Sequence, residues 1–207
     1  MRKYITLLSA AALLATPAFA QARGFDADFT KAVTGPFKLE VVVSEDLAHR
    51  ANNLPKKLSD RGSGSRLNAS FANNGRYGDR EIEYLIEDMQ KEINEDFAKR
   101  GLNISDSAPT LLRVTIEDVR NNRPTFKQLS QDTGLSFRSF GIGGADVSAE
   151  FISAGGTVIG SAEYDYYSDL NDGFNQGRAV WADTTRAFSR FSKRLSKKLA
   201  AMDATSS

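Results

Sequence analysis

The chain has 207 residues, of which 27 are basic, 26 are acidic and none is cysteine. This length fits one domain with a sizeable core, and the balanced charge gives no reason to expect a nucleic-acid partner. Without cysteine the chain has no disulfide, thiolate nucleophile or zinc–thiolate site. We therefore expect the apolar core alone to stabilise the fold.

The first twenty residues have the pattern of a cleavable secretory signal. Arg2-Lys3 precedes an uncharged, mostly apolar run over 4–15, which ends at Pro17 and Ala18-Phe19-Ala20. Small residues two apart mark a cleavage site, and the run is shorter than the roughly 20 residues that span a bilayer. We predict export to the periplasm and a mature chain from Gln21, without lipid attachment because no cysteine follows. The alternative is an N-terminal anchor or a buried helix.

The domain boundaries follow from this prediction. Removing residues 1–20 takes away two basic residues and no acidic one, so the net charge of +1 becomes −1. We expect a lead-in over 21–36, a single α/β domain over 37–202 and a disordered tail over 203–207.

The domain is predicted to begin with a strand over 37–43, whose apolar residues alternate and so share one face: Phe37, Leu39, Val41 and Val43. Ser44 is placed to cap a short helix that ends near Pro55. The stretch over 59–78 is rich in Gly, Ser, Asn and Arg, which predicts a long, mobile surface loop.

From residue 79 the spacing of the apolar residues changes to that of a helix. Apolar residues recur three or four positions apart over 79–100, namely Ile82, Ile86, Met89, Ile93 and Phe97, and this spacing predicts one buried helical stripe. Several carboxylates lie between them, and we expect these on a solvated face.

A second strand is predicted around Leu112, Val114 and Ile116, ending at Asn121-Asn122-Arg123-Pro124. The segment over 123–144 that follows is long and mixes large apolar with cationic residues, the types enriched where partners bury surface. We predict that it contacts a partner through Arg123, Phe126, Lys127, Leu129, Leu135, Phe137, Arg138 and Phe140. The alternative is that the segment closes one end of the sheet and buries its own phenylalanines.

Two further strands form a predicted hairpin over 145–153 and 157–167. The junction Ala154-Gly155-Gly156-Thr157 supplies two residues for the positive φ angles of a type I′ turn. That register pairs Phe151 with Gly160, Ala149 with Ala162 and Val147 with Tyr164, which complement one another in bulk.

The last predicted helix covers 173–201, with Asn171 or Asp172 as its cap and an apolar stripe that includes Phe188, Phe191 and Leu195. The side away from that stripe is strongly cationic: Arg186, Arg190, Lys193, Arg194, Lys197 and Lys198. Cations near a helix C-terminus suit the helix dipole. This face either contacts anionic lipid or an acidic partner, or it is simply solvated.

The order strand, helix, strand, strand, strand, helix predicts an α+β fold. It has a single mixed or antiparallel sheet of about four strands, with two long helices packed on one face.

The last third of the sequence has an arrangement of glycines and strands that resembles that of known protein families. Ser139-Phe140-Gly141-Ile142-Gly143-Gly144-Ala145 precedes an alternating strand, Gly155-Gly156, a second strand and a long terminal helix. This arrangement resembles bacterial envelope proteins and lipoproteins of the DUF4410 and DUF3313 type, which are similar in outline to the N-terminal domain of TolB and to periplasmic auxiliary lipoproteins. The resemblance covers roughly 37–200 and implies a small envelope module that binds or assists partners. It transfers no catalytic residue, and the chain departs from the lipoproteins by lacking their lipid-bearing cysteine.

Catalytic and cofactor motifs are largely missing from the sequence. A triad needs a histidine between an acid and a nucleophile, and the single histidine, His49, stands in a polar segment. The glycines at 141–144 precede a strand, whereas phosphate loops follow one and open a helix. Asp169 to Gly173 lacks the glycine and glutamate positions of a calcium loop.

We therefore expect no cofactor and a non-catalytic binding or assembly module with an envelope protein partner. A peripheral protein that binds anionic lipid is the first alternative. A hydrolase that uses carboxylates is the second.

Overall fold

The computed structural model describes residues 24–30, 33–61, 70–168 and 179–206. Among them, five strands form one mixed sheet in the order β1-β5-β4-β3-β2. The strands are β1 (Phe25–Phe29), β2 (Phe37–Val43), β3 (Thr110–Arg120), β4 (Gly144–Ile152) and β5 (Val158–Tyr167). Only β2 and β3 pair in parallel, and the other pairs are antiparallel.

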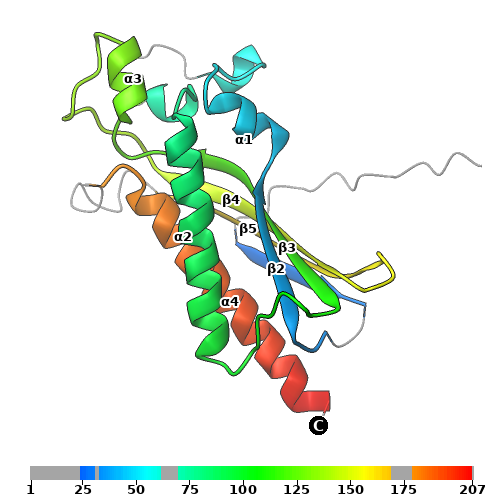
Figure 1. Cartoon of the computed structure of the whole chain (residues 1–207). Coiled ribbons are helices and arrows are strands. Elements are labelled where there is room, and N and C mark those ends of the chain that lie inside the picture. Colours follow the sequence, from blue (N-terminus) through cyan, green and yellow to red (C-terminus); the bar gives the residue numbers. More distant parts are fainter. Residues whose placement is uncertain (1–23, 31–32, 62–69, 169–178, 207) are drawn as a thin grey trace, which may run out of the picture.

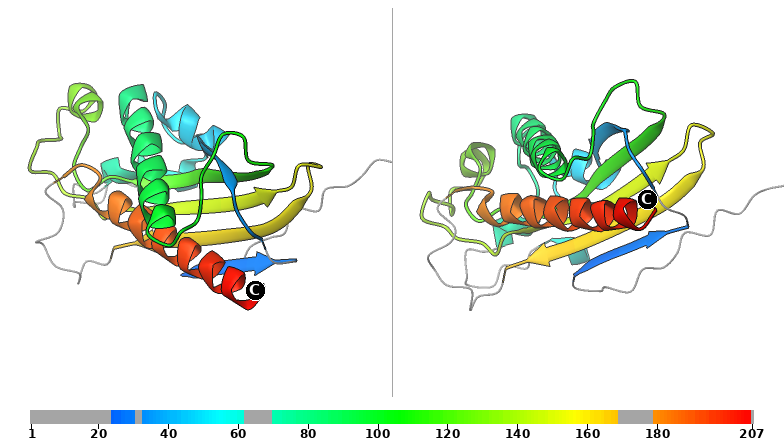
Figure 2. Two further views of the ribbon diagram at one scale, coloured as in Figure 1. Left: turned by 60° about the horizontal axis from the view of Figure 1, so that its bottom comes forward. Right: turned by 90° about the horizontal axis from the view of Figure 1, so that it is seen from below.

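The helices lie mainly on one side of this sheet. The long α2 (Asp79–Ala98) and α4 (Ala182–Ser206) pack against each other and across the same face, as Figure 1 and Figure 2 show. The short α1 (Glu45–Arg50) follows β2, and α3 (Phe126–Gln131) projects at the same end. The single-turn helices η1 (Leu58–Asp60) and η2 (Ser70–Asn73) complete the described elements.

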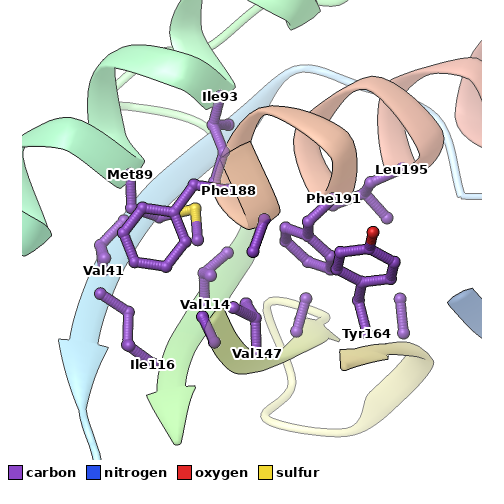
Figure 3. Packing of buried hydrophobic residues seen from close by; sticks show 14 of the residues in the cluster. Val41, Met89, Ile93, Val114, Ile116, Val147, Tyr164, Phe188, Phe191 and Leu195 are labelled. Atoms are coloured by element: carbon purple, nitrogen blue, oxygen red, sulfur yellow. The ribbon is translucent and has the colours of Figure 1, made fainter. Parts of the chain in front are cut away.

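The core fills the space between the sheet and the two long helices (Figure 3). Met89 and Ile93 from α2 meet Phe188, Phe191 and Leu195 from α4, and all five are fully buried. They pack on Val114, Ile116, Val147 and Tyr164 of the sheet. The apolar stripes predicted for both helices are therefore the buried ones.

The predicted α+β class with a single mixed or antiparallel sheet is confirmed, and the sheet is mixed; it has five strands among the described residues, where about four were expected. The additional strand β1 lies in the expected lead-in and pairs with the free edge of β5. Its five residues include two aspartates, and so short and polar a stretch gives a weak strand pattern. Its Phe25 and Phe29 still pack against the core.

The hairpin register is confirmed for all three predicted pairs, Phe151 with Gly160, Ala149 with Ala162 and Val147 with Tyr164. The turn is not type I′, because only Gly156 has a positive φ, of 79°. A register shift beyond Phe151 and a three-residue loop after Ser153 replace the two-residue turn. The bulge absorbs the extra residue, so the pairing of the rest of the hairpin is unchanged.

Two other expectations need correction. The stretch over 59–78 is not all surface loop, because Phe71 and Tyr77 are buried and the Tyr77 hydroxyl donates to the carbonyls of Ala72 and Val119. The helix α4 continues to Ser206, into the segment expected to be a disordered tail. The signal peptide, Gln21, and the caps Asn171 and Asp172 lie outside the described residues.

Candidate functional site

The segment over 123–144 is anchored to the body of the protein by the buried side chain of Gln128. Thr125 begins α3 with a capping box, in which its hydroxyl accepts from the Gln128 amide and Gln128 Oε1 accepts from the Thr125 amide. Such boxes fix the entry into a helix. The Gln128 Nε2 also donates to the carbonyls of Phe71 (3.0 Å) and Gly75 (2.8 Å). Neither the capping box nor the anchoring role of Gln128 was predicted from the sequence, although the Thr-x-x-Gln pattern indicates such a box.

The rest of the segment is held by Arg123. Its guanidinium donates to the carbonyls of Arg138 (3.0 Å) and Ser139 (3.2 Å), and it lies 5.3 Å from the centre of the Phe140 ring. Arg123 and Phe140 therefore serve the internal packing of the segment, as the self-packing alternative expects.

Two phenylalanines behave differently. Phe126 is 78% exposed and Phe137 is 71% exposed, yet their rings contact each other edge to face with centroids 5.9 Å apart. Arg138 beside Phe137 is also exposed, and Lys127 is half-buried with its Nζ on Asn52 Oδ1. The structure thus brings two distant aromatic side chains together at the surface. We call Phe126 and Phe137 the aromatic pair.

The two leucines of the predicted set lie between these extremes. Leu129 and Leu135 are half-buried, and Leu135 lines a small cavity of about 60 Å³ with Leu54 and Phe71. The segment therefore buries part of its apolar surface and displays the aromatic pair.

On α4, most of the predicted cationic residues are exposed. Arg190, Lys193, Arg194, Lys197 and Lys198 are all at the surface. The guanidinium of Arg190 lies over the Tyr166 ring (4.4 Å) and that of Arg194 over the Tyr164 ring (5.1 Å). Arg186 differs, because it is half-buried and pairs with Asp183 at 2.7 Å.

The sheet face opposite the helices is acidic, which sequence reasoning missed. Asp118, Asp146 and Asp165 occupy directly paired positions on three adjacent strands. In the neighbouring row Glu163 pairs with Asp26. The pairing of Asp146 with Asp165 follows from the predicted hairpin register, so the signal was present in the sequence.

A β-bulge adds Glu117 to this face. The register of β3 shifts between Ile116 and Asp118, so the side chains of Glu117 and Asp118 both reach the open face. There Glu117 accepts from the Ser148 hydroxyl (2.7 Å) and Asp118 from the Tyr167 hydroxyl (3.0 Å). We call the carboxylates of Asp26, Asp28, Glu117, Asp118, Asp146, Glu150, Glu163 and Asp165 the acidic sheet face.

Crowding of like charges changes the titration of this face. Burial, followed by the charges of Glu117, Asp118, Asp165 and Glu163, raises the pKa of Asp146 to about 6. Burial and the charges of Asp26 and Glu117 raise the pKa of Glu163 in the same direction. One end of the face borders a polar cavity of about 370 Å³, lined by Arg50, Asp118, Arg120 and Asp146 among others.

Within the described ranges no group of three or more His, Asp or Glu side chains has the arrangement of a metal site. His49 lies half-buried on α1, and Gly144 opens β4 rather than a helix. In the same residues, no helix is long and apolar enough to cross a membrane.

The sequence matches no protein-family model and no curated protein. Among solved structures, two dodecamers of PelC from Paraburkholderia phytofirmans are similar in part. The first, a leucine-to-methionine variant, has 10% identity and a TM-score of 0.37, over 83% of this chain and 95% of that chain. The second has 12% identity and the same TM-score, over 82% and 96%.

Proposed function

We propose that this protein is an exported, non-catalytic binding module of the bacterial envelope, which holds a protein partner through the aromatic pair. One observation carries the proposal: Phe126 and Phe137 are largely exposed but fixed against each other. Large aromatic side chains dominate the energetics of protein interfaces, and an exposed pair of them leaves apolar area for a partner to cover.

The anchoring of the segment supports the same function. The buried Gln128 and the internal contacts of Arg123 hold the backbone on either side of the aromatic pair. A surface that is ordered before binding loses less conformational entropy on association. The neighbouring Arg138 adds a positive charge at the rim, so the partner surface is expected to be apolar with an acidic border.

In-cell crosslinking tests the proposal. A photoreactive amino acid at Ser136, which is exposed beside the pair, is expected to crosslink a partner in intact cells. Phe126→Ser with Phe137→Ser should abolish the crosslink. Val158→Ser is the matched control, because Val158 is an exposed apolar residue on the hairpin, 46% exposed. Crosslinks that persist in the double variant would refute the role of the pair.

The location is tested separately. Edman sequencing of the protein from the periplasmic fraction should start at Gln21. A chain that retains Met1 in that fraction would overturn the predicted cleavage.

A further inference from the structure

We propose that copies of this protein associate head to tail, with the acidic sheet face of one copy against the outer side of α4 of the next. This inference concerns surfaces other than the aromatic pair and is independent of the proposed function.

The acidic sheet face is short of positive charge. Its basic residues lie toward one side of the sheet or are already engaged. Lys38 is on the edge strand β2. Arg113 pairs with Glu40 at 2.7 Å and faces Glu150 on β4, and Arg120 lies over the Tyr167 ring and 3.8 Å from Asp118. From α1, Arg50 pairs with Asp118 at 2.5 Å. Asp146 and Glu163 have no ion pair with any other described residue.

This arrangement opposes folding. Like charges directly opposite each other on neighbouring strands are destabilising, and three aspartates are aligned here across β3, β4 and β5. The basic groups nearby compensate Asp118 and, through Arg113, Glu150, whereas Asp146 and Glu163 have no such partner among the described residues. A cationic surface from outside the chain would relieve the remaining repulsion.

The outer side of α4 supplies such a surface. Lys193, Lys197 and Lys198 are exposed and form no ion pair with another residue in the part of the chain that the structure describes. Their neighbours Arg190 and Arg194 are held over tyrosine rings, so the positive charge along the helix is partly fixed in place. Positive potential that is already positioned steers and orients an acidic partner.

The two charged surfaces cannot meet within one copy. The long helices cover one face of the sheet, as the right-hand view in Figure 2 shows. The strand register and the alternation of side chains place the carboxylates on the other face. A two-fold dimer through either surface would place like charge against like charge. Contact between unlike surfaces is heterologous, and repeated heterologous contacts give a closed ring or an open filament.

The position of α4 within the helical layer fits this contact. α4 packs over β4, β5 and β1, whereas α2 packs over β2. The exposed side of α2 carries acids such as Glu83 and Glu87, which would repel the acidic sheet face of a neighbour. The neighbour is therefore expected to sit toward α4, displaced from α2.

Charge reversal of each surface tests the inference. The acidic-face variant is Asp26→Lys with Glu163→Lys, and the helix variant is Lys193→Glu with Lys197→Glu. The mature protein from residue 21 is studied by analytical ultracentrifugation at low salt and at about 0.5 M salt, where the Debye length is about 4 Å. The wild type should sediment as an assembly at low salt and as a monomer at high salt.

Each variant alone should be a monomer at low salt, since the substituted positions of one surface then place like charge against the unchanged surface of the next copy. An equimolar mixture should recover the assembly size of the wild type, because each variant then offers the charge that the other lacks. Glu83→Lys with Glu87→Lys is the control, which changes the net charge by the same amount as the acidic-face variant and should remain assembled. Circular dichroism melting shows that each variant is folded.

Three results would overturn the inference: a wild type that is monomeric at low salt, single variants that still assemble, or a mixture that stays monomeric. Binding of a monomeric wild type to phosphatidylglycerol vesicles, lost in the helix variant, would assign α4 to lipid instead. None of these results affects the crosslink at the aromatic pair, so the two proposals fail separately.

Discussion

Asp146→Asn is expected to stabilise the protein at neutral pH and to have no effect at acidic pH. The carboxyl of Asp146 has a pKa of about 6 instead of its ordinary 3.8, because it is partly buried and surrounded by acids. The folded state thus keeps a proton that the unfolded chain has already lost. Stability from this group therefore falls as the pH rises from about 4 to about 6.

The magnitude follows from the same shift. A change from 3.8 to about 6 would correspond to about 3 kcal/mol for a group wholly shielded from water. Asp146 is only half-buried, and solvent screening reduces the effect to about 1 kcal/mol. In a domain of this size that is a rise in Tm of about 2–4 °C at pH 7.

Urea unfolding of wild type and variant from pH 4 to pH 7.5, at low protein concentration, measures the effect. The difference in unfolding free energy should be near zero at pH 4 and should grow to about 1 kcal/mol by pH 7. Asp28→Asn on β1, an exposed position, is the matched control, which removes one carboxylate of the same face. Destabilisation at pH 7, or an equal effect at every pH, would refute the account of the crowded carboxylates.

Three further substitutions test the core, the anchor of the 123–144 segment and the aromatic pair separately. Phe191→Ala removes a fully buried ring that contacts Phe25 and Tyr164 and should lower the free energy of unfolding by about 3–5 kcal/mol, measured in urea. An unchanged free energy of unfolding would show that the apolar stripe of α4 does not face the core. Phe126→Ser with Phe137→Ser should cost only about 1 kcal/mol, because both rings are mostly exposed and little apolar area returns to water; a large drop in Tm would favour self-packing. Gln128→Leu leaves buried backbone groups without their partners and should cost about 2–4 kcal/mol, with hydrogen exchange accelerated in α3; unchanged exchange would show that Gln128 is not the anchor.

The elements with a strong period were predictable from the sequence. The strand over 37–43 has the same bounds in the structure, and the helix predicted over 79–100 is found over Asp79–Ala98. The stripes of α2 and α4 were found because burial on one side of a helix imposes a repeat near 3.6 residues. The hairpin register was found because large residues face small ones across it.

Elements that depend on tertiary contacts were not predictable in this way. The strand β1 exists because β5 has a free edge and because Phe25 meets Phe191, and neither fact is visible in five residues of sequence. Phe71 and Tyr77 stand in a stretch with loop composition, and they are buried because the chain folds back over the end of β3. Local pattern carries no information about such long-range contacts.

The predicted partner segment shows the same division. Composition singled out the segment over 123–144 but gave no way to tell Phe140, which packs against Arg123, from Phe126 and Phe137, which are exposed. That distinction depends on where α3 begins and on how Gln128 orients it. The acidic sheet face, in contrast, could have been found by reading the predicted hairpin register on its polar side.

Core and surface residues contribute very different amounts to the free energy of unfolding, so the role of a surface can be tested without unfolding the protein. A single buried aromatic such as Phe191 contributes about 3–5 kcal/mol, whereas the crowding at Asp146 costs about 1 kcal/mol. The core between the sheet and the two long helices therefore tolerates the aligned acids, and their removal leaves the fold intact. A change in assembly after charge reversal at Asp26 and Glu163 then reports on contact between copies rather than on unfolding. The same reasoning holds for the aromatic pair, whose loss exposes little that was buried.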